Sequence, residues 1–91
     1  MKRVRVRIEG RVQGVCYRGW TVDEAERRGL DGWVRNRRDG SVEAIFAGDA
    51  ALVDDMIQAC WQGPPAARVT DIKTTPEAEP VDRGFFQAPS A

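Results

Sequence analysis

The stretch from Glu9 to Trp20, EGRVQGVCYRGW, has the composition of a loop that binds phosphate. Its glycines allow successive backbone N–H groups to point at one anion, and the N-terminus of a following helix adds positive potential. Arg18 would supply a planar fork of donors for the phosphate oxygens. Taken alone this pattern is a weak signal, because a tight strand-to-helix turn with a solvated Arg18 has the same composition.

Two common phosphate chemistries do not fit this loop. A nucleotide-binding Walker A loop requires a lysine followed by serine or threonine, and no lysine lies between Glu9 and Trp20. A cysteine phosphatase places its thiol and its arginine at opposite ends of a longer loop, whereas Cys16 is only two residues from Arg18. The chain also has no histidine, so the commonest general base and the commonest metal ligand are both missing.

The loop is expected to join a strand to a helix. Arginines alternate with valine and isoleucine over residues 3–9, and this period of two predicts a half-buried strand that ends in the glycine-rich stretch 10–14. Acidic residues followed by arginines match the dipole of a helix from about residue 17 or 18 to Arg28. Gly29 is expected to end that helix.

Residues 32–48 predict two strands joined by a tight turn around an Asp-Gly pair. A two-residue turn would pair Arg37 with Val42 and place an arginine on the apolar face. A three-residue turn over residues 38–40 pairs Arg37 with Ser41 instead, and it satisfies every apolar residue of both strands. The second register is therefore the predicted one.

This register places Asn36 on the helix-facing side of its strand, among apolar residues, while Arg35 faces Glu43 on the other side as an ion pair. In a β-α-β unit the strand-to-helix loop can lie beside the strand that follows the helix, so Asn36 would project towards Arg18. A buried asparagine needs hydrogen-bond partners. Asn36 is thus either part of a site or a residue that only ties the loop backbone.

A second helix is predicted to begin after Asp49 as N-cap and to end at the Gly-Pro-Pro stretch 63–65. A strand is expected around residues 67–74, where an irregular apolar spacing indicates a bulge. A short last strand is expected at Phe85 and Phe86, followed by a frayed tail. The expected core stripe of the second helix consists of Leu52, Val53, Met56, Ile57, Cys60 and Trp61.

The element order β-α-β-β-α-β predicts an α+β fold of the ferredoxin-like kind. Its antiparallel sheet would carry both helices on one face, with a possible short fifth strand at an edge. The other face would be open to solvent. The side chains expected on that open face are Arg3, Arg5, Arg7, Trp33 and Arg35.

Ninety-one residues predict a single domain, 1–91, with one modest core. Residues 1–38 carry eleven Lys and Arg against five Asp and Glu, a net charge of +6, and residues 39–91 carry three against nine, a net charge of −6. This asymmetry indicates either an anionic ligand or two halves whose charges mix in the fold. Without an apolar run of about 18 residues or a signal peptide, the chain is expected in the cytoplasm, with Cys16 and Cys60 reduced.

Two long motifs carry a resemblance to a known family. GRVQGVCYR, residues 10–18, and GLDGWVRNRRDGSVEA, residues 29–44, resemble the acylphosphatase signatures GxVQGVxFR and GWVxNxxDGxVE. GPPAARV, residues 63–69, resembles the family's exit from the second helix, so the likeness covers nearly the whole chain. Tyr17 stands where the family usually has phenylalanine, and the C-terminal FFQAPSA fits loosely.

The resemblance implies hydrolysis of the mixed anhydride of a carboxylic acid and phosphate, with no metal and no cofactor. It implies that Arg18 and the loop amides hold the phosphate, and that Asn36 orients the attacking water. The implied partners are a small-molecule acyl phosphate and, as product inhibitor, inorganic phosphate. No nucleic-acid or membrane partner is expected, and the protein is expected to be a monomer. The implied substrate-binding residues are Gln13, Gly14, Val15, Cys16, Tyr17 and Arg18.

Two other classes remain open at this point. A non-catalytic module could hold phosphate or another small anion in the same loop, although the presence of both Arg18 and Asn36 favours hydrolysis. A ferredoxin-like RNA-binding module is supported only by the arginines of the open face. Such modules stack bases on aromatic residues of their central strands, whereas residues 41–48 offer only Phe46, on the core side.

Overall fold

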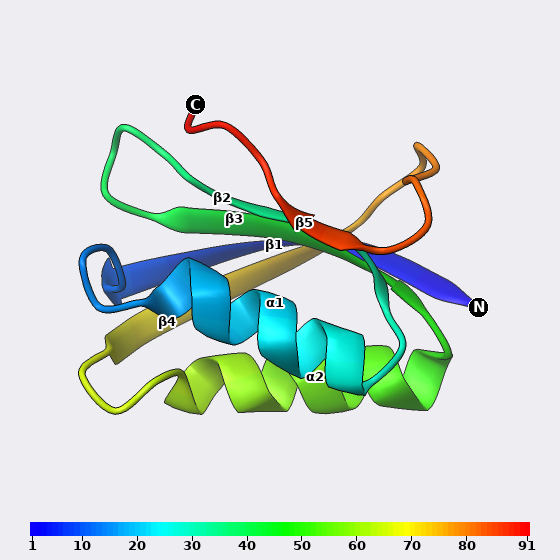
Figure 1. Ribbon diagram of the computed structural model, residues 1–91, viewed down its shortest axis with the longest axis horizontal. Coiled ribbons are helices and arrows are strands. Elements are labelled where there is room, and N and C mark those ends of the chain that lie inside the picture. The colour runs from blue at the N-terminus through cyan, green and yellow to red at the C-terminus, as the bar shows by residue number, and fades with distance from the viewer.

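The computed structural model describes residues 1–91 and contains five strands and two helices. The elements are β1 (Lys2–Arg11), α1 (Tyr17–Arg27), β2 (Asp31–Asn36), β3 (Val42–Gly48), α2 (Ala50–Gln62), β4 (Arg68–Pro76) and β5 (Phe85–Gln87). The strands form one sheet in the order β4-β1-β3-β2-β5, and both helices cover the same face of it (Figure 1). The predicted ferredoxin-like arrangement is confirmed.

The fifth strand makes the sheet mixed rather than wholly antiparallel. β1 pairs antiparallel with β3 and β4, and β2 pairs antiparallel with β3, but β5 pairs parallel with β2. After β4 the chain crosses to the opposite edge of the sheet and returns in the direction of β2 (Figure 1). The expected short edge strand is confirmed, and the expected antiparallel pairing holds for β1 to β4, whereas β5 adds a parallel pair.

Alternation along β1 builds the central part of the core. Val4, Val6 and Ile8 are at most 3% exposed and face the helices, while the arginines between them face the open side. They meet apolar partners on β3, where Val4 lies opposite Phe46. Burial of each such side chain contributes about 1.5–3 kcal/mol to the stability of the fold. The central strands, and with them the loops at their ends, are therefore held in fixed positions.

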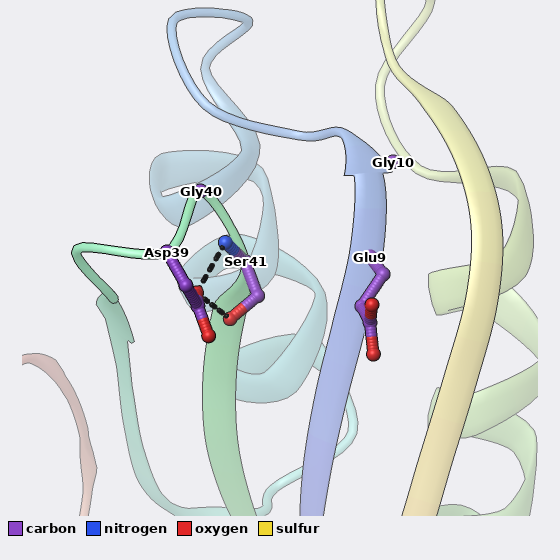
Figure 2. Close-up of a pocket in the computed structure, with 5 residues that line it drawn as sticks. All are labelled: Glu9, Gly10, Asp39, Gly40 and Ser41. Carbon is purple, nitrogen blue, oxygen red and sulfur yellow. Dashed lines mark hydrogen bonds between the residues drawn. The ribbon is translucent and has the colours of Figure 1, made fainter.

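The turn between β2 and β3 has the predicted three-residue form. The Arg37 N–H donates to the Ser41 carbonyl at 2.9 Å, and Gly40 has a φ of 95°, which favours glycine. Asp39 accepts hydrogen bonds from the backbone N–H and the hydroxyl of Ser41, at 2.9 and 2.6 Å (Figure 2). Asn36 pairs with Val42, as the predicted register requires.

A bulge in β4 lies where the apolar spacing predicted one. Glu9 pairs with Asp71 and Gly10 with Val69, so Thr70 is the extra residue between them. Gly10 has a φ of 125°, and a Cβ atom on it would lie 2.1 Å from the Arg68 carbonyl oxygen. Only glycine fits here. β1 continues through Gly10 and ends at Arg11, whereas the sequence predicted that the strand would end where the glycine-rich stretch begins.

The buried face of α2 is narrower than its sequence suggests. Val53, Met56 and Cys60 are fully buried, but Leu52 is 40% and Trp61 is 44% exposed. On a helix these two residues flank the buried stripe on opposite sides, and a helix on a flat sheet contacts it only along the centre of the stripe. The prediction that both belong to the core is wrong. Neither helix is long and apolar enough to cross a lipid bilayer.

The open face of the sheet is a network of ion pairs. The Glu43 carboxylate, on a residue only 6% exposed, accepts hydrogen bonds from Arg5, Arg35 and Arg37 at 2.7–3.2 Å. Burial acts to raise the pKa of Glu43, but the hydrogen bonds from Arg5 and Arg35 outweigh it and hold the pKa below its usual value. Both guanidinium groups also lie over the ring of Trp33.

These ion pairs join the basic half of the chain to the acidic half. Arg5 also contacts Glu77, and on the helix side of the fold Arg28 contacts Asp55. Of the two interpretations of the charge asymmetry, the fold therefore shows the one in which the charges of the two halves mix. The ion pair predicted between Arg35 and Glu43 is confirmed.

The C-terminal tail is docked, not frayed. The Ala88 N–H donates to the Val34 carbonyl at 2.8 Å, and the Ala91 N–H donates to the Asn36 carbonyl at 3.0 Å. Arg38 in turn donates its N–H to the Ala91 carbonyl oxygen at 2.7 Å. These bonds satisfy the outer edge of β2 beyond β5, where unpaired backbone groups would otherwise remain. The tail thereby lies beside the end of β2 that carries Asn36.

Candidate active site

The loop between β1 and α1 leaves the N-terminus of the helix open. Cys16 occupies the N-cap position with a φ of 65°, and it is the only residue other than glycine with a positive φ. Its side chain makes no capping hydrogen bond. The first N–H groups of a helix have no partner within it, so those of Tyr17, Arg18 and Gly19 remain available to an anion.

A pocket of about 450 Å³ lies in front of these N–H groups. Arg18 enters it from the first turn of α1, and Asn36 enters it from the last residue of β2. The fold thus brings a guanidinium and an amide to one cavity across eighteen residues of sequence. The residues lining the pocket are Val12, Gly14, Cys16, Tyr17, Arg18, Gly19, Asn36 and Gln87.

Asn36 has an amide with unused hydrogen-bonding capacity. Its Oδ1 atom is buried and has no hydrogen-bond partner in the protein. A buried polar atom without a partner is rare and calls for an explanation. No side-chain hydrogen bond joins Asn36 to the phosphate loop, so the reading of Asn36 as a tie for the loop backbone finds no support in the contacts. Asn36 lines the pocket, and no hydrogen bond within the protein engages its amide, whose Oδ1 atom is itself buried.

The remaining predicted site residues divide into two groups. Gly14, Cys16 and Tyr17 line the pocket with Arg18, whereas Gln13 and Val15 do not. The Val15 side chain is only 8% exposed and belongs to the core. The Gln13 side chain is directed to the β2–β3 turn, where its Nε2 donates to two backbone carbonyls. For these two residues only the backbone N–H remains a candidate for contact with an anion.

Tyr17 lines the pocket, and its ring is buried. Its hydroxyl donates a hydrogen bond to the Cys60 carbonyl in α2, and its ring lies 5.3 Å from that of Trp20. Burial raises the pKa of the Tyr17 hydroxyl far above its usual value, so it remains a protonated donor. This contact fixes the first turn of α1, which carries Arg18, against α2.

Sequence reasoning missed Gln87 as a lining residue. Gln87 reaches the pocket because β5 pairs with β2 in a register that places it opposite Val34. No motif near Gln87 indicates this, since the pairing joins segments 53 residues apart in a loosely patterned part of the chain. Trp20 is half-buried, packs against the core and does not line the pocket.

A second pocket, of about 200 Å³, lies between the end of β1 and the β2–β3 turn (Figure 2). Its two carboxylates already have partners: Glu9 contacts Lys73, and Asp39 contacts Arg7 and Ser41. Nowhere in the chain do three Cys, Asp or Glu side chains gather as a set that could hold a metal ion. Both cysteines are free, Cys16 exposed and Cys60 buried.

Comparisons with known proteins agree with this geometry. The family model described as Acylphosphatase matches residues 4–87. An acylphosphatase of Rhodospirillum rubrum is 59% identical over 90 residues, which cover 99% of each chain. The crystal structure of acylphosphatase from Bacillus subtilis superposes with a TM-score of 0.88 at 37% identity, over 96% of this chain and 97% of that one. An acylphosphatase structure from Coxiella burnetii gives a TM-score of 0.91 at 29% identity, over 96% and 92%. With its loop, its pocket and these relatives, the chain belongs to the acylphosphatase family, whose members hydrolyse acyl phosphates.

Proposed function

We propose that this protein hydrolyses acyl phosphates by direct attack of water on the phosphoryl group. Arg18 and the backbone N–H groups of residues 13–18 hold the phosphate, and Asn36 orients the water. One observation carries this assignment: Arg18 and Asn36, whose buried Oδ1 atom has no partner in the protein, line the same cavity at the N-terminus of α1.

The leaving group explains why so few residues suffice. The water oxygen forms a bond to phosphorus while the bond between phosphorus and the acyl oxygen breaks, and the carboxylate departs with the electron pair. A carboxylic acid has a pKa of about 4, so its carboxylate leaves without a proton from a general acid. The proton of the attacking water passes to a phosphate oxygen of the substrate, and no protein base is needed. Esters of alcohols are poor substrates in this scheme because an alkoxide leaves far less readily.

The protein contributes position and charge. In phosphoryl transfer, negative charge spreads over the equatorial oxygens of the transferring group, and donors placed around them lower the barrier. The open N-terminus of α1 and the fork of Arg18 supply such donors in one place. Asn36 approaches from β2, on a different element, and from there its amide holds the water.

The proposal also covers product inhibition, oligomeric state, location and nucleic-acid binding. Inorganic phosphate, the product, competes with the substrate for the loop. Residues 1–91 fold as one domain and act as a monomer in the cytoplasm, where the two free thiols stay reduced. It does not act on nucleic acid, because the arginines Arg5 and Arg35 of the open face are engaged by Glu43.

Turnover of acetyl phosphate in the presence of EDTA tests the proposal. We expect hydrolysis at an unchanged rate with the chelator, and competitive inhibition by inorganic phosphate. Activity that is lost in EDTA and restored by a divalent cation would overturn the metal-free mechanism. Phosphate binding without any turnover would instead identify the chain as an anion-binding module.

Replacement of Cys16 by serine is expected to leave activity within about threefold, a change in barrier below about 0.7 kcal/mol. The thiol lines the pocket, but it lies only two residues from Arg18, too close to attack a phosphorus atom held by that arginine. The measurement is the kcat of Cys16→Ser, together with mass spectrometry of the wild-type protein quenched during turnover. Detection of a phosphocysteine would replace direct water attack by a covalent mechanism.

A further inference from the structure

The side chain of Gln13 joins the phosphate loop to the turn that follows Asn36. Its Nε2 donates to the Arg37 carbonyl at 2.7 Å and to the Ser41 carbonyl at 2.8 Å. Both partners are carbonyl oxygens, which only accept hydrogen bonds. Of the two polar atoms of the Gln13 amide, only Nε2, with its two hydrogens, can donate to both, and this fixes the orientation of the amide.

The two carbonyls mark the two ends of the β2–β3 turn. The turn is closed by the hydrogen bond from the Arg37 N–H to the Ser41 carbonyl, and Arg37 follows Asn36 directly in the chain. No other side-chain hydrogen bond joins residues 12–16 to residues 36–42. Gln13 is therefore the one polar tie between the loop that holds phosphate and the strand end that carries the water-orienting amide.

The same strand end is anchored from its other face. The Arg37 guanidinium donates to Glu43 at 3.2 Å, and Glu43 is itself held by Arg5 and Arg35. The backbone at Arg37 is thus fixed towards the open face by an ion pair and towards the loop by Gln13. If only the Arg37–Glu43 ion pair were present, the β2–β3 turn would keep its place in the sheet. The β1–α1 loop would then be free to shift relative to that turn.

We propose that Gln13 is a positioning residue for hydrolysis, which sets the distance between the phosphate in the loop and the Asn36 amide. The proposal rests on the roles assigned above to the loop and to Asn36. Gln13 itself touches neither substrate nor water with its side chain. It acts by holding Asn36 in line with the bound phosphoryl group, and a misplacement of about 1 Å between reacting groups can cost up to about a hundredfold in rate.

Gln13→Met tests this role, because methionine has a similar length and no donor. We expect kcat to fall about tenfold, while the inhibition constant of inorganic phosphate changes less than about twofold, since the loop and Arg18 stay on one continuous segment. Gln58→Met, on the exposed side of α2, is the matched control and should change neither quantity. Thermal unfolding of each variant ensures that kinetics are compared on folded protein.

A double-mutant cycle with Asn36→Ala separates positioning from general support of the fold. If Gln13 acts through Asn36, Gln13→Met should lower kcat by less than about twofold once Asn36 is alanine. An unchanged kcat in Gln13→Met, an equal loss in both backgrounds, or a phosphate inhibition constant that rises in step with the fall in kcat would each overturn the proposal. Asn36→Ala with wild-type kcat would instead contradict the water-orienting role, and it is measured independently of Gln13.

Should Gln13→Met fail to fold, Gln13→Asn replaces it in the same cycle. Asparagine keeps the amide but is one methylene shorter, so it cannot reach both carbonyls. The expected result is a smaller fall in kcat with the same dependence on Asn36, and a loss independent of Asn36 would again overturn the proposal.

Discussion

Arg18→Ala is expected to remove nearly all hydrolysis of acyl phosphates while the protein stays folded. Loss of one donor group around the transferring phosphoryl costs about 10²–10³ in kcat, or about 2.7–4 kcal/mol, and Arg18 contributes two donors and a full charge. Its guanidinium makes no hydrogen bond or ion pair within the protein, so the fold loses little with it. The measurements are kcat/KM with acetyl phosphate and the thermal midpoint of unfolding.

Two further variants sharpen this test. Arg18→Lys keeps the charge but not the planar fork, and it should retain less than about a tenth of the rate, a loss of more than about 1.4 kcal/mol. A higher rate in the lysine variant would show that charge alone suffices and that the two-pronged contact is wrong. Arg11→Ala is the matched control, because Arg11 is exposed at the other end of the same loop and does not line the pocket.

The second large effect is expected for Asn36→Ala, and it should be confined to kcat. If the amide orients water, its removal lowers kcat strongly, while the inhibition constant of phosphate stays nearly unchanged because Arg18 and the loop still hold the anion. The Asn36 Oδ1 atom has no partner in the protein, so the free energy of unfolding should change by less than about 1 kcal/mol.

The decisive comparison is between the kcat of Asn36→Ala and its inhibition constant for inorganic phosphate. Parallel changes in kcat and in the phosphate inhibition constant, with a drop in stability of about 1–3 kcal/mol, would return Asn36 to a purely structural role. The contacts argue against that outcome, since the tie between loop and turn is made by Gln13 and not by Asn36.

Local patterns in the sequence determined most of the architecture. Strict alternation in β1 allowed only one face to be buried, because successive side chains of a strand point to opposite sides. The Asp-Gly pair and the need to keep Arg37 off the apolar face selected a single hairpin register, and that register is the one in the fold. The same argument placed Asn36 on the helix side, where it lines one pocket with Arg18.

The tertiary structure alone decided features that depend on contacts between distant segments. Leu52 and Trp61 have the spacing of core residues, but how far around a helix the buried stripe extends depends on the surface beneath it. The parallel pairing of β5, the docked tail and the place of Gln87 in the pocket follow from which sheet edge remained free. The contact of Gln13 has the same origin: its amide finds its partners 24 and 28 residues away, and no local pattern encodes a hydrogen bond to a backbone carbonyl of another element.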